Sequence, residues 1–309
     1  ILGKDGHLLP FFITVANTAP TDVDVVRKGN ERVIRARLND AKFYFESDIK
    51  KPLVDRVSAL KGVVFQAKLG TSFEKVERFT SLALFLGAKV GFSRPLEAGE
   101  VPSDFASDAF NPARYDPKSI DPGLYSKYIL GRAALLAKAD LTSGVVGEFP
   151  SLQGIMGSVY ANRGGEAQDV SVAIYEHYLP SSSGGALPAS LAGALVSIAD
   201  KMDTIAGCFS VGLIPTGAQD PYALRRQALG IIAIVLDKGF RLDMGELVDE
   251  ALSLLSTKAT KDKGEIREGV LDFFKERLRN QLLSQGHSHD SIDAVPSAPW
   301  HDMNDAVKR

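Results

Sequence analysis

Apolar residues recur three or four positions apart over most of the chain, and this periodicity predicts a mainly α-helical protein. One helix start is marked by Thr71 followed by Glu74, a capping-box pattern. Another is marked by Asp220 before Pro221, which predicts an N-cap with proline in the first helical position. The predicted helices cover about 22–47, a segment after Pro52, a segment from 72, 124–141, 151–161, 166–179, 187–205, 221–238, 243–256 and 262–285. One predicted core-facing row is Leu187, Leu191, Leu195, Ile198, Met202 and Ile205.

Two segments depart from this helical pattern. Residues 8–15 form a short apolar run rich in β-branched and aromatic residues, which predicts one buried strand. No partner strand is apparent, so we interpret the run as a remnant of an upstream sheet and the chain as the middle of a longer protein. Residues 93–122 are rich in Pro, Ser and Asp without periodicity, which predicts a long surface loop.

Composition narrows the class of protein. Apolar residues at 45% and charged residues at 24% are typical of a globular protein, and the net charge of −2 over 309 residues gives no overall nucleic-acid footprint. The single cysteine, Cys208, excludes an intrachain disulfide and indicates a buried thiol in a reducing compartment. No apolar run approaches the roughly 18 residues that span a bilayer. We therefore expect a cytoplasmic protein with no membrane partner.

The most informative chemical pattern lies between residues 138 and 203. Lys138 and Asp140, a later His177, and then Asp200 and Asp203 resemble in order and spacing an HD phosphohydrolase domain. In that family a His-Asp pair and a later Asp on packed helices hold a divalent metal. Here Lys138 and Asp140 stand where the His-Asp pair is expected, and a lysine ammonium has no lone pair for a metal. We predict a degenerate site without metal, in which Lys138 acts as a built-in cation beside the carboxylates.

Two interpretations of this group stay open at this point. A mixed metal site of a phosphohydrolase could be built from four of its side chains, Asp140, Glu148, His177 and Asp200. Alternatively, His177 is an interior histidine held by hydrogen bonds, and an aspartate pairs with a neighbouring cation such as Lys138 or Lys201.

Cationic side chains supply candidate RNA contacts, because arginine presents a forked donor set suited to phosphate. The alternative for these side chains is a solvated, ion-paired surface, with Arg225 or Arg226 bonded to Asp220 or Asp203. The candidates are Arg32, Arg35, Lys68, Arg225, Arg226, Lys275, Arg277 and Arg279.

Four phrases in order are specific enough to indicate a family. They are residues 29–38 (GNERVIRARL), 65–71 (FQAKLGT), 148–154 (EFPSLQG) and 215–226 (PTGAQDPYALRR). Together they resemble the beta subunit of bacterial-type glycyl-tRNA synthetase. In that family an alpha subunit activates glycine with ATP and Mg²⁺, and the beta subunit holds the tRNA through HD-like, body and anticodon-binding domains.

The resemblance implies three parts of this chain. Residues 1–50 would be the end of an upstream α/β domain and a long linker helix, 51–240 an HD-like helical bundle, and 241–309 a helical body region with the start of the anticodon-binding region. The implied partners are the alpha subunit and tRNA-Gly. No P-loop, dinucleotide fingerprint or Ser-His-Asp order is present in the sequence, so we expect no cofactor and no catalytic residue in this segment.

We therefore predict a tRNA-engaging and assembly segment that supports glycine attachment catalysed on the alpha subunit. The alternatives are a metal-dependent HD-type phosphohydrolase and a purely structural spacer between subunits.

Overall fold

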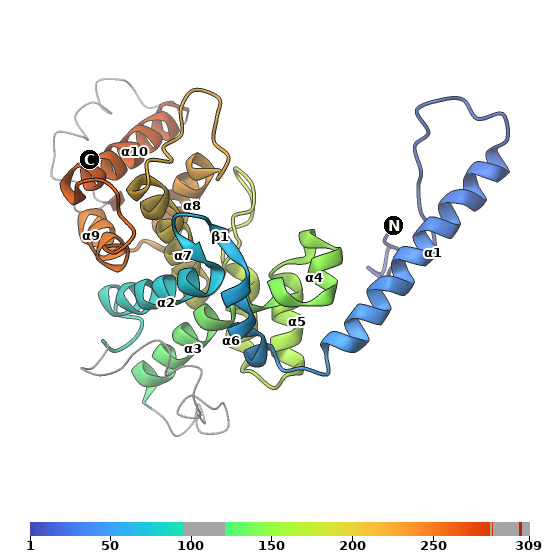
Figure 1. Ribbon diagram of the computed structural model, residues 1–309, viewed down its shortest axis with the longest axis horizontal. Helices are drawn as coiled ribbons and strands as arrows, with labels where there is room; N and C mark the ends of the chain where they lie inside the picture. The colour runs from blue at the N-terminus through green and yellow to red at the C-terminus, as the bar shows by residue number, and fades with distance from the viewer. Residues whose placement is uncertain (96–120, 285, 287–302, 305–309) are drawn as a thin grey trace.

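The computed structural model describes residues 1–95, 121–284, 286 and 303–304, and this part of the chain is mainly helical (Figure 1), as predicted. The HD-like topology stays a prediction. Most of the predicted loop 93–122 lies outside the described residues. The helices are α1 (Val23–Asp48), η1 (Leu53–Gly62), α2 (Ser72–Lys89), α3 (Pro122–Leu136), η5 (Ala139–Thr142), α4 (Gly144–Glu148), η6 (Pro150–Leu152), α5 (Ile155–Arg163), α6 (Gln168–Glu176), α7 (Leu191–Ser210), α8 (Leu224–Lys238), α9 (Met244–Leu254) and α10 (Lys263–Ser284).

The β structure does not lie where the sequence predicts it. In the described residues the named strands are β1 (Val64–Gln66) and β2 (Gly70–Thr71), a short antiparallel pair. The predicted strand at 8–15 is wrong: Ile13 is 79% exposed, and the segment makes one isolated bridge, between Leu2 and Leu8. An apolar run becomes a strand only when a neighbour accepts its backbone hydrogen bonds, and no described segment does so.

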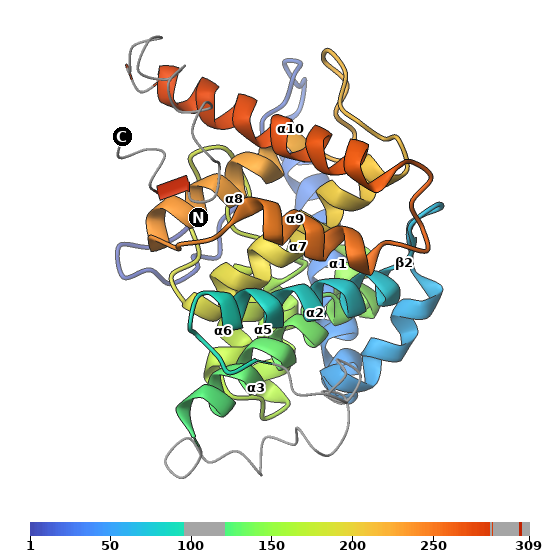
Figure 2. The same ribbon diagram turned by 90° about the vertical axis from the view of Figure 1, so that its left-hand side faces the viewer.

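Helix α7 forms the centre of the bundle. It is buried along nearly its whole length and packs against α2, α3, α6, α8, α9 and α10 (Figure 2). A helix buried on all sides in this way is stable only when neighbours surround it. Helices α9 and α10 join the same continuous core, while the predicted division at residue 240 stays a prediction.

Two helix starts show how local sequence sets the geometry. The capping box before α2 is confirmed: Thr71 Oγ1 accepts from Glu74 N, and Thr71 N donates to the Glu74 carboxylate at 2.7 Å. The predicted start of α8 at Pro221 is wrong, because the helix begins at Leu224 after Ala223 in a left-handed conformation. Asp220 still accepts from the first helical N–H groups, at 2.8 Å from Leu224 N.

Helix α1 projects from the bundle (Figure 1), and only its last residue, Asp48, is buried. The Asp48 carboxylate accepts from the backbone N–H groups of Gly144 and Val145 and from the Tyr160 hydroxyl, each at 2.9 Å, and pairs with Arg56 at 3.0 Å. This single carboxylate therefore joins the arm to α4, α5 and η1. The amphipathic helix is confirmed, but the described residues leave most of its apolar face uncovered.

No helix in the described segments is both long enough and apolar enough to cross a membrane.

The core row on α7 gives a matched pair of substitutions. Leu195 is 0% exposed, whereas Leu191, predicted to share its face, lies at the start of the helix and is 44% exposed. We expect Leu195→Ala to lower the free energy of unfolding by about 2–5 kcal/mol, because it removes buried methyl groups and leaves a cavity. Leu191→Ala should change it by less than about 1 kcal/mol. Urea unfolding of both variants tests this, and equal losses would contradict the placement of the core.

Candidate functional site

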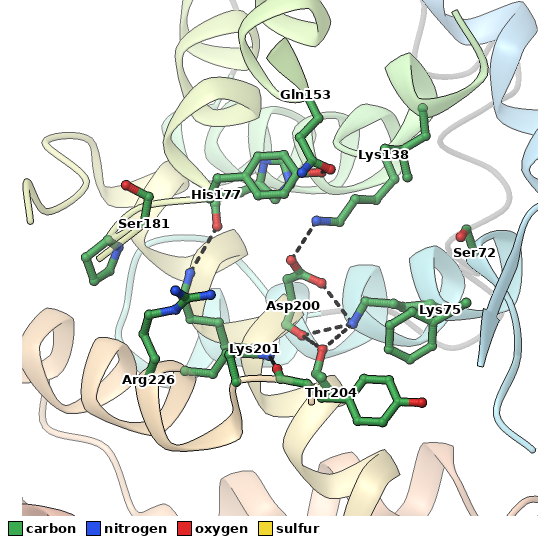
Figure 3. A pocket seen from close by; sticks show the side chains of 17 residues that line it. Ser72, Lys75, Lys138, Gln153, His177, Ser181, Asp200, Lys201, Thr204 and Arg226 are labelled. Carbon is green, nitrogen blue, oxygen red and sulfur yellow. Dashed lines mark hydrogen bonds and ion pairs between the residues drawn. The ribbon is translucent and has the colours of Figure 1, made fainter. Parts of the chain in front are cut away.

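A cavity of about 460 Å³ opens between α2, α7 and the start of α8 (Figure 3). Lys138, His177 and Asp200, three members of the predicted degenerate site, line it. Arg226, predicted as an RNA contact, lines it as well. Residues from distant parts of the sequence thus meet in one depression, as the HD-like pattern predicts.

Asp200 lies between two lysines. Lys138 Nζ is 2.8 Å from Asp200 Oδ2, and Lys75 Nζ is 2.9 Å from Asp200 Oδ1. Burial alone raises the pKa of the Asp200 carboxyl, but the ammonium groups of Lys138 and Lys75 hold it well below its usual range. The carboxylate is therefore ionised and neutralised by lysine, which is the arrangement predicted for Lys138.

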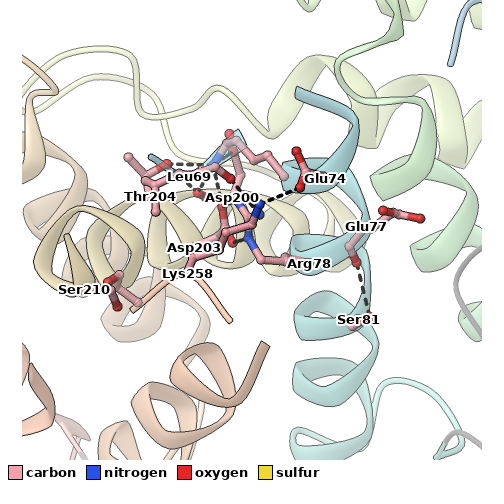
Figure 4. A network of polar contacts seen from close by, with 12 residues as sticks. Leu69, Glu74, Glu77, Arg78, Ser81, Asp200, Asp203, Thr204, Ser210 and Lys258 are labelled. Carbon is pink, nitrogen blue, oxygen red and sulfur yellow. Dashed lines mark hydrogen bonds and ion pairs between the residues drawn. The ribbon is translucent and has the colours of Figure 1, made fainter. Parts of the chain in front are cut away.

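A second buried carboxylate, Asp203, joins α7 to α2 (Figure 4). Arg78 Nε donates to Asp203 Oδ1 at 2.6 Å, and Lys75 Nζ lies 3.2 Å from Asp203 Oδ2. Lys75 also donates to Thr204 Oγ1 at 2.7 Å. The sequence interpretation missed Lys75 and Arg78. The sequence did contain a signal for these two residues, because both are charged positions on the apolar face of the capped helix α2, next to or near Val76.

His177 is an interior histidine. It is fully buried, and its Nδ1 contacts the Ile174 carbonyl oxygen. Burial and the neighbouring charge of Lys138 hold the pKa of the imidazole well below its usual value, so the ring is neutral. With Nδ1 as the donor, Nε2 carries the lone pair, and it has no hydrogen-bond partner among the described residues.

Lys201 secures the segment that follows His177. Its Nζ donates to His177 O at 3.2 Å, Leu179 O at 2.9 Å and Ser197 Oγ at 2.6 Å. Burial lowers the pKa of this ammonium to about 7, and Lys138 and Lys75 add to the shift against the opposing effect of Asp200. Lys201 therefore bonds backbone carbonyls, and Asp200 takes its partners from Lys138 and Lys75.

Asp140 forms hydrogen bonds with backbone N–H groups. Its Oδ2 accepts from Gly154 N at 2.6 Å and Gly157 N at 2.9 Å, and burial raises the pKa of its carboxyl. Gly154 has φ +79°, and a Cβ there would lie 2.4 Å from the Tyr178 ring. The glycine that ends the phrase at 148–154 is thus required by backbone geometry.

Glu148 does not join this group. It lies on α4 and forms an ion pair with Arg37 of α1. Within the described ranges, no three His, Cys, Asp or Glu side chains are placed to hold a metal ion. The interpretation in which Glu148 converges with His177 and Asp200 on a metal is therefore wrong for this structure.

Three of the predicted RNA contacts meet in a second, larger cavity. This groove, of about 830 Å³, lies between α8, α10 and the Ser-Gly turn at 182–185, and Arg225, Arg226 and Arg277 line it. In the described part of the chain neither guanidinium, of Arg225 or of Arg226, forms an ion pair, so the alternative in which one of them pairs with Asp220 or Asp203 is wrong; Asp220 accepts instead from the Arg225 backbone N–H at 3.0 Å. Arg277 stacks on the Phe273 ring, with Cζ 3.5 Å from the centroid.

The other cationic candidates lie outside the groove. Arg32 and Arg35 are exposed on α1, and Lys68 is exposed in the turn between β1 and β2. Lys275 pairs with Asp272 at 3.1 Å on α10, and Arg279 is half-buried on the same helix. Their roles in RNA binding stay predictions.

Comparison with known proteins points to the same family as the four sequence phrases. A family model described as glycyl-tRNA synthetase beta subunit matches residues 1–297. The chain is 51% identical to the glycine–tRNA ligase beta subunit of Geobacter metallireducens, 49% to that of Syntrophus aciditrophicus and 50% to that of Geobacter sulfurreducens. Each alignment covers 100% of this chain and 40% of the relative. The chain thus spans about 40% of the length of these relatives.

The buried clamp between α2 and α7 leads to a stability prediction. Asp203→Ala leaves Arg78 without its buried counter-charge, while Lys75 keeps only Asp200, and should lower the free energy of unfolding by about 3–5 kcal/mol. The matched control is Asp249→Ala, which breaks an exposed pair with Arg267 and should cost roughly 0.2–1 kcal/mol. Urea unfolding at pH 7 compares them. A loss at Asp203 no larger than at Asp249 would contradict a buried clamp.

Lys201 makes stability depend on pH. Its folded pKa of about 7 lies below the 10.5 of a free lysine, so between pH 7 and 10 the unfolded chain binds more protons than the folded one. The free energy of unfolding contributed by this group should therefore rise with pH, by at most about 1.4 kcal/mol per pH unit. Lys201→Met should remove that rise. Urea unfolding at pH 7.5 and 9 measures the two slopes, and identical slopes would refute the assignment.

Proposed function

Since the chain belongs to the glycyl-tRNA synthetase beta subunit family, we propose that it is the tRNA-engaging and assembly segment of that subunit. Glycine attachment to tRNA-Gly would be catalysed on the alpha subunit, with ATP and Mg²⁺ used there and no cofactor held by this segment. We propose that this reaction takes place in the cytoplasm. The segment's own contribution would be to hold the RNA and to connect the parts of the enzyme.

The groove between α8 and α10 carries the RNA-binding part of this proposal. Arg225 and Arg226 follow each other at the first turn of α8, where the helix dipole also favours an anion. Arg277 lines the same groove from α10, and so does the turn at 182–185. Several guanidinium groups along one groove suit the phosphate backbone of an RNA, which supplies most of the affinity in such complexes.

The exposed arm supports the assembly part. Apolar side chains on α1 face solvent in this structure, among them Val33 at 61%, Leu38 at 65% and Phe43 at 68% exposure. Exposed apolar residues gathered on one element mark surfaces that another protein or domain covers. Because the chain spans about 40% of its relatives' length, the rest of the subunit and the alpha subunit are the proposed occupants.

The phosphohydrolase alternative receives no support from the donor set. Lys138 brings an ammonium to Asp200, where a metal would need lone pairs. Asp140 instead accepts hydrogen bonds from two backbone N–H groups, and Glu148 forms an ion pair with Arg37 of α1. We therefore propose that this segment performs no HD-type hydrolysis.

Binding of tRNA-Gly at two salt concentrations tests the groove. We expect the association constant to fall steeply with salt, and Arg225→Gln/Arg226→Gln to weaken binding at least tenfold while lowering the salt slope by about two. The control is Lys50→Gln/Lys51→Gln, which removes the same charge from an adjacent exposed pair after α1.

Equal losses in the two double variants would refute the groove, and salt-independent binding would refute the phosphate mechanism. If no tRNA binds at low salt while the alpha subunit is still captured, only the assembly role survives.

A further inference from the structure

We propose that the cavity at Lys138 and His177 binds a small phosphoryl anion that also carries a hydroxyl hydrogen, as hydrogen phosphate does and as a phosphate monoester does in its monoanionic form. This inference goes beyond the RNA role proposed above, which rests on the larger groove between α8 and α10; Arg226 lines both spaces, whereas Arg225 lines only the groove. The evidence is the charge, the open acceptor and the size of the cavity.

The charge lining the cavity is strongly positive. Three side chains that stay cationic at pH 7.5 face a single lining carboxylate, Asp200. The second carboxylate beneath them, Asp203, is shared between Lys75 and Arg78. The three cations are Lys75, Lys138 and Arg226. One carboxylate cannot neutralise them, so the cavity attracts an anion.

Arg226 is the cation that remains available. It is exposed at the mouth of the cavity and forms no hydrogen bond or ion pair among the residues described. Figure 3 shows it extending from α8 toward the segment of His177 and Ser181, and these three residues line the same space. A guanidinium held there can donate two parallel hydrogen bonds to a phosphoryl group.

His177 selects the kind of anion. The side chain is fully buried, lines the cavity and is neutral, and its Nε2 has no partner among the described residues. A buried acceptor left without a donor costs about 1–3 kcal/mol, so a ligand that supplies a hydrogen is favoured. The P–OH group of hydrogen phosphate can donate to Nε2, and sulfate at neutral pH has no such hydrogen. The cavity should therefore distinguish phosphate from sulfate.

The size of the cavity leaves room for an ester substituent. Its volume of about 460 Å³ falls in the range of small-molecule sites and greatly exceeds that of the anion itself. Phe65, Tyr178 and Tyr222 provide apolar wall around the charged centre. The monoanion of a phosphate monoester with a compact organic group fits this combination.

Calorimetric titration with inorganic phosphate and with sulfate, at matched ionic strength and pH 7.5, tests the inference. We expect one phosphate per chain, with sulfate at least tenfold weaker. Arg226→Gln should weaken phosphate binding at least tenfold. Arg225→Gln is the matched comparison, because Arg225 is the neighbouring residue and lines only the groove, so phosphate binding should not change.

Absence of phosphate binding at 10 mM, roughly the upper end of a specific weak site, would overturn the inference while leaving the tRNA result intact. Equal binding of sulfate, or equal losses in the Arg225 and Arg226 variants, would overturn it as well, since each indicates a general anion surface. Displacement of bound phosphate by 5′-phosphorylated but not dephosphorylated tRNA-Gly would support the site with the RNA end as its source. Simultaneous binding of tRNA and phosphate would support it with a free metabolite as the source.

Discussion

The buried pairing of α7 carboxylates with α2 cations is the constraint on which the rest of the structure depends. Asp200 and Asp203 lie on the most buried helix, where an unpaired charge is strongly destabilising. Lys75 and Arg78, one turn apart on α2, satisfy both and so fix how the two helices are aligned along their lengths. The Lys138 ammonium completes this group, because it pairs with the second oxygen of Asp200.

Lys138 stands where the HD-like sequence pattern would have a metal ligand. Together with Lys75 it places positive charge beside Asp200, so the buried carboxylate is neutralised by the protein's own side chains. These cations also determine what the cavity attracts. A metal site presents carboxylates to a cation, whereas this cavity presents cations and one open histidine acceptor.

The phrases that indicate the family divide into two physical classes. The phrase at 148–154 sets a backbone conformation, because Gly154 adopts a positive φ beside Tyr178 and its N–H donates to Asp140. The phrase at 215–226 positions side chains at a surface. Its Asp220 caps the first N–H groups of α8, and that ordered start positions Arg225 at the groove and Arg226 at both cavities. The second phrase thus supplies the arginines of the proposed RNA and anion sites, and from the first phrase Gln153 lines the smaller cavity.

The sequence by itself determined most of the helices and the capping box at Thr71, because periodicity and caps are local properties. It also predicted that the Lys138 ammonium would lie beside a carboxylate, and Lys138 pairs with Asp200. Tertiary structure decided the rest. Which cation meets Asp203, where Glu148 points, and whether the run at 8–15 finds a partner strand all depend on contacts between segments far apart in the chain. Such contacts leave no periodic signal, so only packing resolves them.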